Sequence, residues 1–374
     1  MKFSISKKSL INVVQKALPV IPNVTSLNVL HNFKMIFSSN KLEVIASDLD
    51  NFVKATTDIT GDGEVEIAVN AKKMFEVVKE IGDELLTLEV INNSLTINSE
   101  SGFTCKITGV NIKDFPNFPD SKYGDTYSIP SSVFNSLVEK SNFAVSRDEA
   151  RACLCGVLWE CSSQRVGMVA TDGHRLGASF SYTELGFEND TSVIVPNKSL
   201  QHILKTIEFG NFENVDFTIS DRNIVFSVDG FTLSAKLIDG PYPDYEKGIP
   251  NEFSKSVIID RKNLISAIKR VSVLSNKKTG LVKFNFEDNN INICANNREI
   301  GGEANQIIPV KYDGEDNFLI GFNGTYLLEI LNIIKTQDIK INMNGQFSAT
   351  VISEVLETEN NDSLFLVMPL RIFD

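Results

Sequence analysis

Asp172 and His174 are the residues whose types and spacing come nearest to a catalytic arrangement in this sequence. The carboxylate could orient the imidazole as a general base, and a serine or cysteine elsewhere could then act as nucleophile. However, the sequence has only three histidines and no GxSxG segment to present a serine at a sharp turn. It also lacks the GxxxxGK[ST] and GxGxxG segments that bind nucleotide phosphates. These absences argue against a hydrolase, a nucleotidase and a dinucleotide-dependent enzyme.

The cysteines do not form the pattern of a metal site or a disulfide framework. They are odd in number and include no CxxC pair: Cys105, Cys153, Cys155, Cys161 and Cys294. Reduced thiols are typical of a cytosolic protein. The first ten residues, MKFSISKKSL, lack the apolar core of a signal peptide, and no stretch is long and apolar enough to span a membrane. We therefore expect a cytoplasmic protein that is not an enzyme and holds no metal or other cofactor.

The segment around Asp172 lies in the second of three similar stretches of chain. Each stretch begins with a short apolar strand, at Phe3, Tyr127 and Val257, and continues into a helix with apolar residues at i, i+3 and i+4. A second helix follows in each, with equivalent apolar positions 126 and 127 residues apart at Met74, Leu200 and Leu327. A repeat of this length sets the architecture of the whole chain.

Alternating apolar and polar runs separate these helices, such as 41–46, 94–98 and 223–228. They are typical of half-buried antiparallel strands that end in Asn, Asp and Gly turns. Proline-rich segments at 115–119 and 241–245 close the first two repeats. The sequence thus predicts an α+β fold of three domains, 1–121, 122–249 and 250–374, each with two helices backed by antiparallel sheets.

Charge is distributed unevenly between the predicted helices and the remaining chain. The net charge is -12, yet the six predicted helical segments together carry +10, which leaves -22 for all other residues. A basic layer of helices inside an acidic shell would attract DNA to one surface and repel it from the rest. The alternative is that these lysines are ordinary solvated residues on exposed helix faces.

The number of helices limits what one chain could enclose. Six helices packed about 9 to 10 Å apart would close around a pore of about 8 Å. Duplex DNA, whose groove depths alone total about 16 Å, would not pass through it. Twelve helices would leave about 25 Å on the same estimate. A ring around DNA would therefore need at least two copies of the chain.

Two segments resemble signature stretches of the bacterial sliding clamp, the beta subunit of DNA polymerase III: Met168–Leu176 (MVATDGHRL) and Val367–Ile372 (VMPLRI). With the threefold repeat, the resemblance covers essentially the whole chain. It implies a non-enzymatic, ring-shaped homodimer that encircles duplex DNA without regard to sequence. It also implies a cleft that takes short peptides from polymerases, the clamp loader and repair proteins.

Carried over by position, the cleft consists of Leu154, Thr171, Gly173, His174, Arg175, Leu176, Pro241, Val367, Met368, Pro369, Leu370 and Arg371. Leu, Met and Pro would form an adaptable apolar floor, and Arg and His at the rim would orient polar groups. Taken without the family, 171–176 is also typical of a strand that ends in a tight Asp-Gly turn.

The resemblance also implies residues that contact DNA and residues that join two copies. The predicted DNA contacts are Lys72, Lys73, Arg147, Lys198, Lys277 and Lys278, whereas Val24 and Asp148 depart from the family's basic or polar pattern. The predicted interface joins Cys105, Lys106 and Ile107 in the first repeat of one copy to Val273 and Leu274 in the third repeat of the other, with Lys106 near Glu299 or Glu303.

A different class of protein remains open at this stage. A repeat-built scaffold for protein interactions that never encloses DNA could have the same three repeats, with the helix charge incidental. Retention on closed circular DNA distinguishes the clamp from this scaffold.

Overall fold

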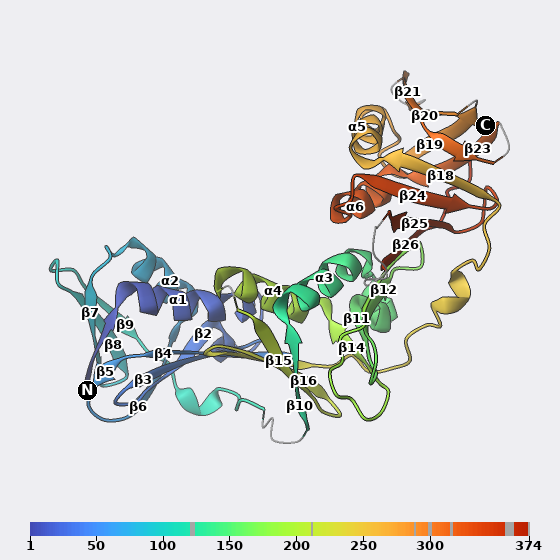
Figure 1. Ribbon diagram of the computed structural model, residues 1–374. Coiled ribbons are helices and arrows are strands. Elements are labelled where there is room, and N and C mark those ends of the chain that lie inside the picture. The colour runs from blue at the N-terminus through green and yellow to red at the C-terminus, as the bar shows by residue number, and fades with distance from the viewer. Residues whose placement is uncertain are drawn as a thin grey trace. The chain divides into compact units, whose positions relative to one another are not determined.

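The computed structural model describes residues 1–119, 124–210, 212–287, 289–297, 301–314, 317–355 and 363–372. The chain forms two compact units. The first unit consists of Met1–Ser132 with Lys198–Leu237, and the second of Val133–Asn197 with Ile238–Asp374. Each unit contains two antiparallel sheets and several helices (Figure 1).

In the first unit, a five-stranded sheet has the order β5-β1-β7-β8-β9. Its strands are β1 (Lys2–Ser6), β5 (Thr60–Gly61), β7 (Leu85–Ile91), β8 (Ser94–Ser99) and β9 (Thr104–Thr108). The eight-stranded sheet β10-β15-β16-β17-β4-β3-β2-β6 contains β2 (Asn32–Phe37), β3 (Lys41–Ser47), β4 (Asn51–Asp58), β6 (Val65–Asn70), β10 (Thr126–Pro130), β15 (Asn214–Ile219), β16 (Asn223–Val228) and β17 (Phe231–Lys236). Helices α1 (Lys7–Ala17), α2 (Ala71–Glu80) and α4 (Asn197–Gly210) lie on one side of these strands (Figure 1).

In the second unit, a nine-stranded sheet has the order β14-β11-β12-β13-β26-β25-β24-β18-β22. Its strands are β11 (Gly156–Cys161), β12 (Val166–Thr171), β13 (Arg175–Ser181), β14 (Thr191–Pro196), β18 (Lys255–Asp260), β22 (Lys311–Asp313), β24 (Asp338–Met343), β25 (Thr350–Glu354) and β26 (Ser363–Val367). The sheet β21-β20-β19-β23 contains β19 (Leu281–Glu287), β20 (Asn290–Asn297), β21 (Gly302–Pro309) and β23 (Phe318–Asn323), and the helices are α3 (Ser131–Ser141), α5 (Arg261–Ser272) and α6 (Gly324–Ile333).

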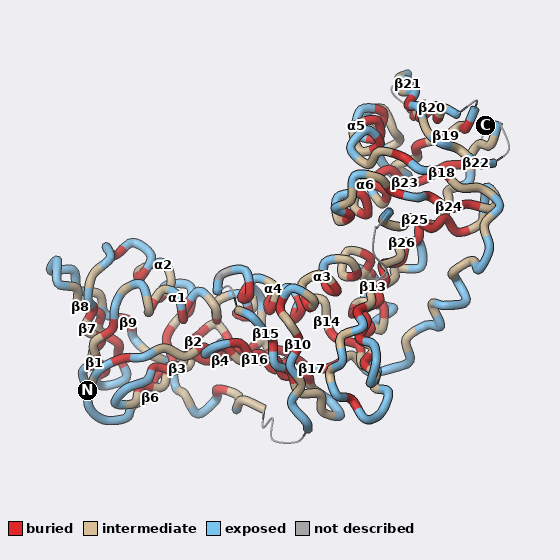
Figure 2. The backbone as a smooth tube through the Cα atoms, viewed as in Figure 1, coloured by how far each residue is buried: buried red, intermediate tan, exposed pale blue. Residues whose placement is uncertain are grey.

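Helices α1, α2, α5 and α6 each begin directly after a strand, at a polar side chain that caps the first turn. Ser6 accepts a hydrogen bond from the Ser9 amide at 3.0 Å, and Asn70 accepts one from the Lys73 amide at 3.0 Å. Asp260 caps α5 in the same way. Such caps satisfy amides that have no partner inside the helix. The buried positions on α1 and α5 follow the predicted apolar spacing, and Figure 2 shows burial along the strands and one side of the helices.

One backbone hydrogen bond recurs in all three repeats. The chain that follows the last strand of each repeat returns to the strand that precedes the second helix. Val110 donates to Ala68 at 2.9 Å, Ile238 to Ile194 at 3.0 Å and Leu370 to Gly321 at 2.8 Å. The predicted threefold repeat of two helices and antiparallel strands is therefore confirmed.

The compact units do not follow the repeats, because sheets continue from one repeat into the next. Strand β4 pairs with β17 in the first unit, and β13 pairs with β26 in the second. The second repeat is therefore shared between the units. The domain limits at 121/122 and 249/250 remain predictions from the sequence.

Candidate peptide-binding surface

The turn between β12 and β13 is fixed by its own side chains. The Asp172 carboxylate accepts hydrogen bonds from the amides of His174 at 2.9 Å and Arg175 at 3.0 Å. The Thr171 hydroxyl donates to the Arg175 carbonyl at 2.7 Å and accepts from the Gly173 amide at 3.1 Å. Gly173 has a φ of +88°, which side chains rarely tolerate. Asp172 thus shapes the turn, because its carboxylate accepts hydrogen bonds from two backbone amides of the turn.

Arg175 lies beneath this turn and not at its rim. Its side chain is only 8% exposed and its Nε atom lies 3.1 Å from Asp172. The guanidinium also pairs with Glu329 and stacks on Tyr326, 4.3 Å from the ring centroid. A buried guanidinium needs such partners. Since Glu329 and Tyr326 belong to α6, Arg175 joins the turn to that helix. This differs from the expected rim position.

The carboxyl-terminal run lies beside the turn. Arg175 in β13 is paired with Val367 in β26, and the Met368 amide donates to the His174 carbonyl at 2.8 Å. Leu370 then pairs with Gly321, where a Cβ atom would lie 3.1 Å from the Leu370 carbonyl oxygen and 2.8 Å from a Leu281 methyl. The two predicted signature stretches are therefore adjacent on one sheet.

The place where β13 of the second repeat pairs with β26 of the third is called the junction below. An apolar cluster extends from this junction over the nine-stranded sheet. Its buried members come from β11 to β14 and from the third repeat: Leu158, Val169, Leu176, Ala178, Ile194, Ala349, Val351 and Leu366. Met368, Cys153 and Tyr242 pack against it and are partly exposed. This cluster could accept apolar side chains of a bound peptide.

The predicted cleft residues lie in the second unit and differ in exposure. Leu154, Arg175, Leu176 and Val367 are buried, whereas Gly173, His174, Pro241 and Arg371 are exposed. Thr171, Met368, Pro369 and Leu370 are intermediate. The cation at the surface is thus Arg371, 5.8 Å from the Phe347 ring centroid.

Two tyrosines of the linker after the second repeat were not predicted as site residues. The Tyr242 hydroxyl oxygen accepts a hydrogen bond from the Thr171 amide at 3.1 Å, and the Tyr245 hydroxyl donates to Glu160 at 2.9 Å. Burial raises the pKa of both phenols, so both stay protonated. The alternation of Tyr and Pro at 241–245 is the signal that could have identified this segment as more than a spacer.

The first unit contains the same backbone arrangement with different side chains. Its β3–β4 turn is closed by Asp48, which accepts from the Asn51 amide at 2.7 Å, and the Lys236 amide donates to the Asp50 carbonyl at 2.8 Å. Strand registers make Asn51 equivalent to Arg175, and Lys236 equivalent to Met368.

At most of the equivalent positions, the first unit has a polar side chain where the second unit has an apolar one. Across the second unit the aligned row is Leu158, Val169, Ala178 and Leu364, and across the first it is Lys34, Ile45, Lys54 and Thr232. Leu366 is likewise replaced by Ser234. Lys34 pairs with Glu66 at 3.0 Å, and Lys54 lies 5.2 Å from the Phe118 ring centroid. An apolar floor is therefore present at one of two equivalent junctions.

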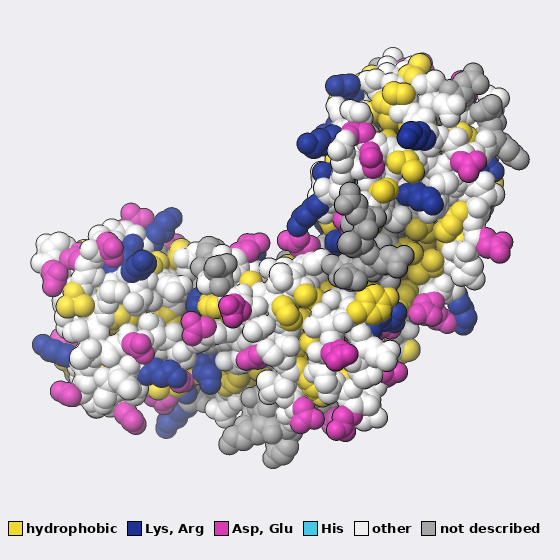
Figure 3. All heavy atoms as spheres, viewed as in Figure 1, with side chains coloured by type: hydrophobic (Ala, Val, Ile, Leu, Met, Phe, Trp, Pro, Cys, Tyr) yellow, Lys and Arg dark blue, Asp and Glu magenta, His cyan; other side chains and the backbone are white. Residues whose placement is uncertain are grey.

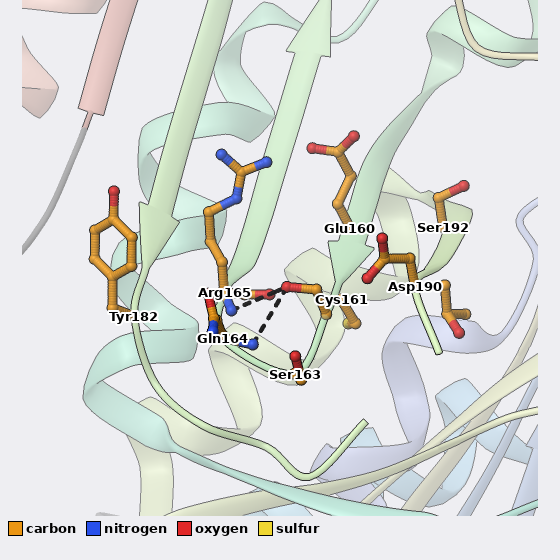
Figure 4. A pocket seen from close by; sticks show the side chains of 10 residues that line it. Glu160, Cys161, Ser163, Gln164, Arg165, Tyr182, Asp190 and Ser192 are labelled. Atoms are coloured by element: carbon orange, nitrogen blue, oxygen red, sulfur yellow. Dashed lines mark hydrogen bonds between the residues drawn. The ribbon is translucent and has the colours of Figure 1, made fainter. Parts of the chain in front are cut away.

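A polar pocket of about 610 Å³ lies at the opposite end of β11 and β12 (Figure 4). Figure 4 shows Glu160, Arg165 and Tyr182 around it. The Ser162 hydroxyl is committed to the turn, where it accepts from the Arg165 amide at 3.0 Å. None of the predicted site residues lines this pocket. Its mixture of acidic, basic and hydroxyl groups offers no apolar floor.

The predicted DNA contacts are exposed and divided between the units. Lys72, Lys73 and Lys198 lie at the starts of α2 and α4 in the first unit, and Arg147, Lys277 and Lys278 lie in loops of the second. Lys198 forms a salt bridge within the chain. Its ammonium lies 2.5 Å from the carboxylate of Asp48, whose side chain is only 12% exposed. Much of its charge is therefore neutralised within the chain.

The predicted interface residues lie at two sheet edges. Cys105, Lys106 and Ile107 belong to β9, the outer strand of the five-stranded sheet. Val273 follows α5 and is 76% exposed, whereas Leu274 is intermediate and lies over Gly302 at the start of β21. Strand β21 is the outer strand of its own sheet. Glu303 is exposed on β21, and Glu299 lies outside the described residues.

Within the described residues, no helix is long and apolar enough to cross a membrane, and no group of His, Cys, Asp or Glu side chains could hold a metal ion.

Known proteins resemble this chain over its full length. Family models for the N-terminal, central and C-terminal domains of the DNA polymerase III beta subunit match residues 1–119, 128–244 and 246–371. The beta sliding clamps of Pseudomonas aeruginosa and Bacillus subtilis are 29% and 27% identical, and each alignment covers all of both chains.

Solved structures give the same result. A crystal structure of the Pseudomonas aeruginosa DNA polymerase III subunit beta has a TM-score of 0.93 at 28% identity, with both chains fully covered. Another from that organism, a DnaN sliding clamp bound to griselimycin, has a TM-score of 0.93 at 27% identity, also with full coverage of both chains. This chain therefore belongs to the family of DNA polymerase III beta subunits, the bacterial sliding clamps.

Proposed function

We propose that two copies of this chain close into a ring around duplex DNA and hold replication and repair proteins there. The apolar surface between the Asp172 turn and the carboxyl-terminal run receives short segments of those proteins. The observation that carries this assignment is the contrast between the two equivalent junctions. The same backbone supports an apolar floor with Met368 in the second unit and a row with Lys34 and Lys54 in the first.

An apolar floor suits a peptide that is anchored by a few apolar side chains, because burial of those side chains supplies most of the binding free energy. Exposed His174 and Arg371 are available at the border to orient backbone or carboxylate groups of the peptide. A catalytic role has no comparable support, since Asp172 and Arg175 are committed to the turn. We infer an accessory protein that acts in the cytoplasm without enzymatic activity of its own.

Two open sheet edges support the pairing of copies. Strands β9 and β21 each have a neighbour on only one side within the described part of the chain. An unpaired edge exposes amides and carbonyls that readily pair with another strand. In a head-to-tail pair, β9 of each copy meets β21 of the other, which gives a closed ring with two identical interfaces. Val273 and Leu274 then cover the apolar side of β9.

DNA is held by enclosure and attracted by the basic helices. Lys72 and Lys73 are exposed at the start of α2, and screening over a Debye length of about 8 Å weakens each contact at physiological salt. A protein that depended on phosphate contacts alone would lose affinity steeply with salt. A closed ring wider than the duplex retains its position without them.

The test is retention on circular DNA. A clamp loader places the protein on a nicked circular plasmid, and gel filtration in high salt then measures the fraction that co-elutes with DNA. We expect co-elution with the circular plasmid and release after a single cut, because the ring slides off an end. Equal retention on circular and linear plasmid would contradict enclosure and favour a scaffold that binds only the DNA surface.

A further inference from the structure

A pocket of about 450 Å³ lies between α1 and α4, which are neighbouring helices of the first unit (Figure 1). Pockets that bind small molecules have volumes of about 300 to 1,000 Å³. None of the site residues predicted from the sequence is among the residues that line this pocket. The lining comes from the two helices and the turn that follows α1: Asn12, Gln15, Lys16, Pro19, His202, Lys205, Thr206 and Glu208.

Helical spacing directs polar side chains of both helices toward this pocket. Lys16 lies four residues after Asn12 on α1, and Lys205 lies three residues after His202 on α4. Residues three or four apart are neighbours on one side of a helix. Each helix therefore contributes one lysine and one further polar group to the same pocket.

His202 is the buried polar residue of the lining. Its side chain is 9% exposed, and its Nδ1 atom has no hydrogen-bond partner within the described residues. The imidazole donates a hydrogen bond to the Pro19 carbonyl, and burial lowers its pKa to about 4, so the ring is neutral at physiological pH. A buried nitrogen without a partner is unfavourable. Because this one belongs to a pocket-lining side chain, a ligand could supply the missing partner.

Two lysines give the pocket an excess of positive charge. Lys16 is partly buried, and burial lowers the pKa of its ammonium, which the exposed carboxylate of Asp229 offsets only in part. Within the described residues, neither Lys16 nor Lys205 forms a salt bridge. Elsewhere on the visible face of the first unit, positive and negative side chains are interspersed (Figure 3). Two lysines without a carboxylate partner favour an anionic ligand.

We propose that the pocket between α1 and α4 binds a free phosphate monoester of the size of a mononucleotide. Its phosphate pairs with Lys16 and Lys205, because a dianion with three acceptor oxygens suits two ammonium groups. The rest of the molecule fills the remaining volume, where Glu208 accepts a hydrogen bond from a sugar hydroxyl or a base amine. A duplex presents its phosphates on a convex surface and does not fill a concave pocket. Binding of the free ligand neutralises two cations of the helices that attract DNA.

The experiment is an NMR titration of the full-length protein labelled at its three histidines. The titrants are deoxyadenosine monophosphate, inorganic phosphate, deoxyadenosine and a short DNA duplex. We expect the mononucleotide to shift the His202 signals saturably, while the signals of His31 and His174, which lie outside the pocket, stay in place. Inorganic phosphate should bind more weakly because it fills less of the pocket. Deoxyadenosine should not bind because it has no anionic group.

Two pocket variants, Lys16→Gln and Lys205→Gln, each remove one cation. We expect each to weaken binding of the mononucleotide about tenfold, the contribution of one hydrogen bond to a charged group. The control carries Lys8→Gln and Lys79→Gln, which remove exposed charges of α1 and α2 outside the pocket and should leave the affinity unchanged. Circular dichroism checks that each variant is folded.

Three results would overturn the proposal. The first is an unshifted His202 signal at millimolar mononucleotide, or equal affinity in wild type and in the folded pocket variants. The second is binding of deoxyadenosine as tight as that of the mononucleotide, which would exclude a role for the phosphate. The third is a duplex that shifts His202 at a lower phosphate concentration than the mononucleotide does, which would make the pocket a contact of DNA.

Discussion

Met368→Lys tests the candidate surface by giving it the residue that the first unit has at the same backbone position. Met368 and Lys236 follow equivalent strands, and their amides make equivalent hydrogen bonds of 2.8 Å, to His174 and to Asp50. The protein already accommodates lysine in this backbone environment. We therefore expect the variant to fold normally, with an unchanged thermal midpoint.

The expected loss is in binding and not in stability. Truncation of a buried interface side chain costs about 1 to 2 kcal/mol. Lysine keeps the methylene groups but places an ammonium beside the apolar cluster that contacts Met368. A bound peptide would remove water from this ammonium, which costs binding free energy. We expect a loss of about 2 kcal/mol, which is about 30-fold in Kd. Met368→Leu, which conserves volume, should cost less than about 1 kcal/mol.

Fluorescence anisotropy with a labelled peptide from a polymerase III catalytic subunit measures this affinity. The matched control is Lys236→Met, which makes the reverse change in the first unit and should leave the affinity unchanged. Undiminished peptide affinity in folded Met368→Lys would show that the carboxyl-terminal run does not line the site.

Two further predictions concern stability. Burial lowers the pKa of His202 to about 4, below the value of about 6.5 in an unfolded chain. About 3 kcal/mol of stabilisation is therefore present above pH 6.5 and is lost as the pH falls toward 4. The thermal midpoint should fall over this pH range in the wild type and much less in His202→Gln. Arg175→Lys should lower the free energy of unfolding by about 2 kcal/mol in denaturant titrations. The reason is that a lysine ammonium cannot pair with both Asp172 and Glu329 while it also stacks on Tyr326. Stability equal to that of the wild type would contradict this account.

The repeat was predictable from the sequence because its signal occurs three times. Apolar spacing located the helices, and Leu10, Val13 and Val14 of α1 are all buried as expected. Helix starts were less visible, since Asn70 and Asp260 resemble loop residues until their side chains are seen to accept the amides of the first turn. The continuation of sheets across repeats had no local signal at all, because strand pairing such as β4 with β17 depends on residues about 180 positions apart.

The sequence predicted which segments form the site, but it did not predict the positions and partners of their side chains. Charge and residue type suggested a rim position for Arg175, yet Asp172, Glu329 and Tyr326 hold it in the interior. Lys198 looked like a free cation, and Asp48 pairs with it from a turn 150 residues earlier. Such pairings come from the tertiary fold, and a single sequence does not reveal them.

Departures from the repeat identify function better than agreement with it does. Positions that agree, such as Asp48 and Asp172, build the same turn twice and report only on folding. Positions that differ, such as Lys236 and Met368, sit on the same backbone and so change the surface without changing the fold. Selection for folding alone would give both junctions similar surfaces, because their backbone hydrogen bonds impose the same requirements. The apolar floor at one junction alone is therefore best explained by a ligand, and grafting lysine there tests that explanation with the protein's own alternative residue.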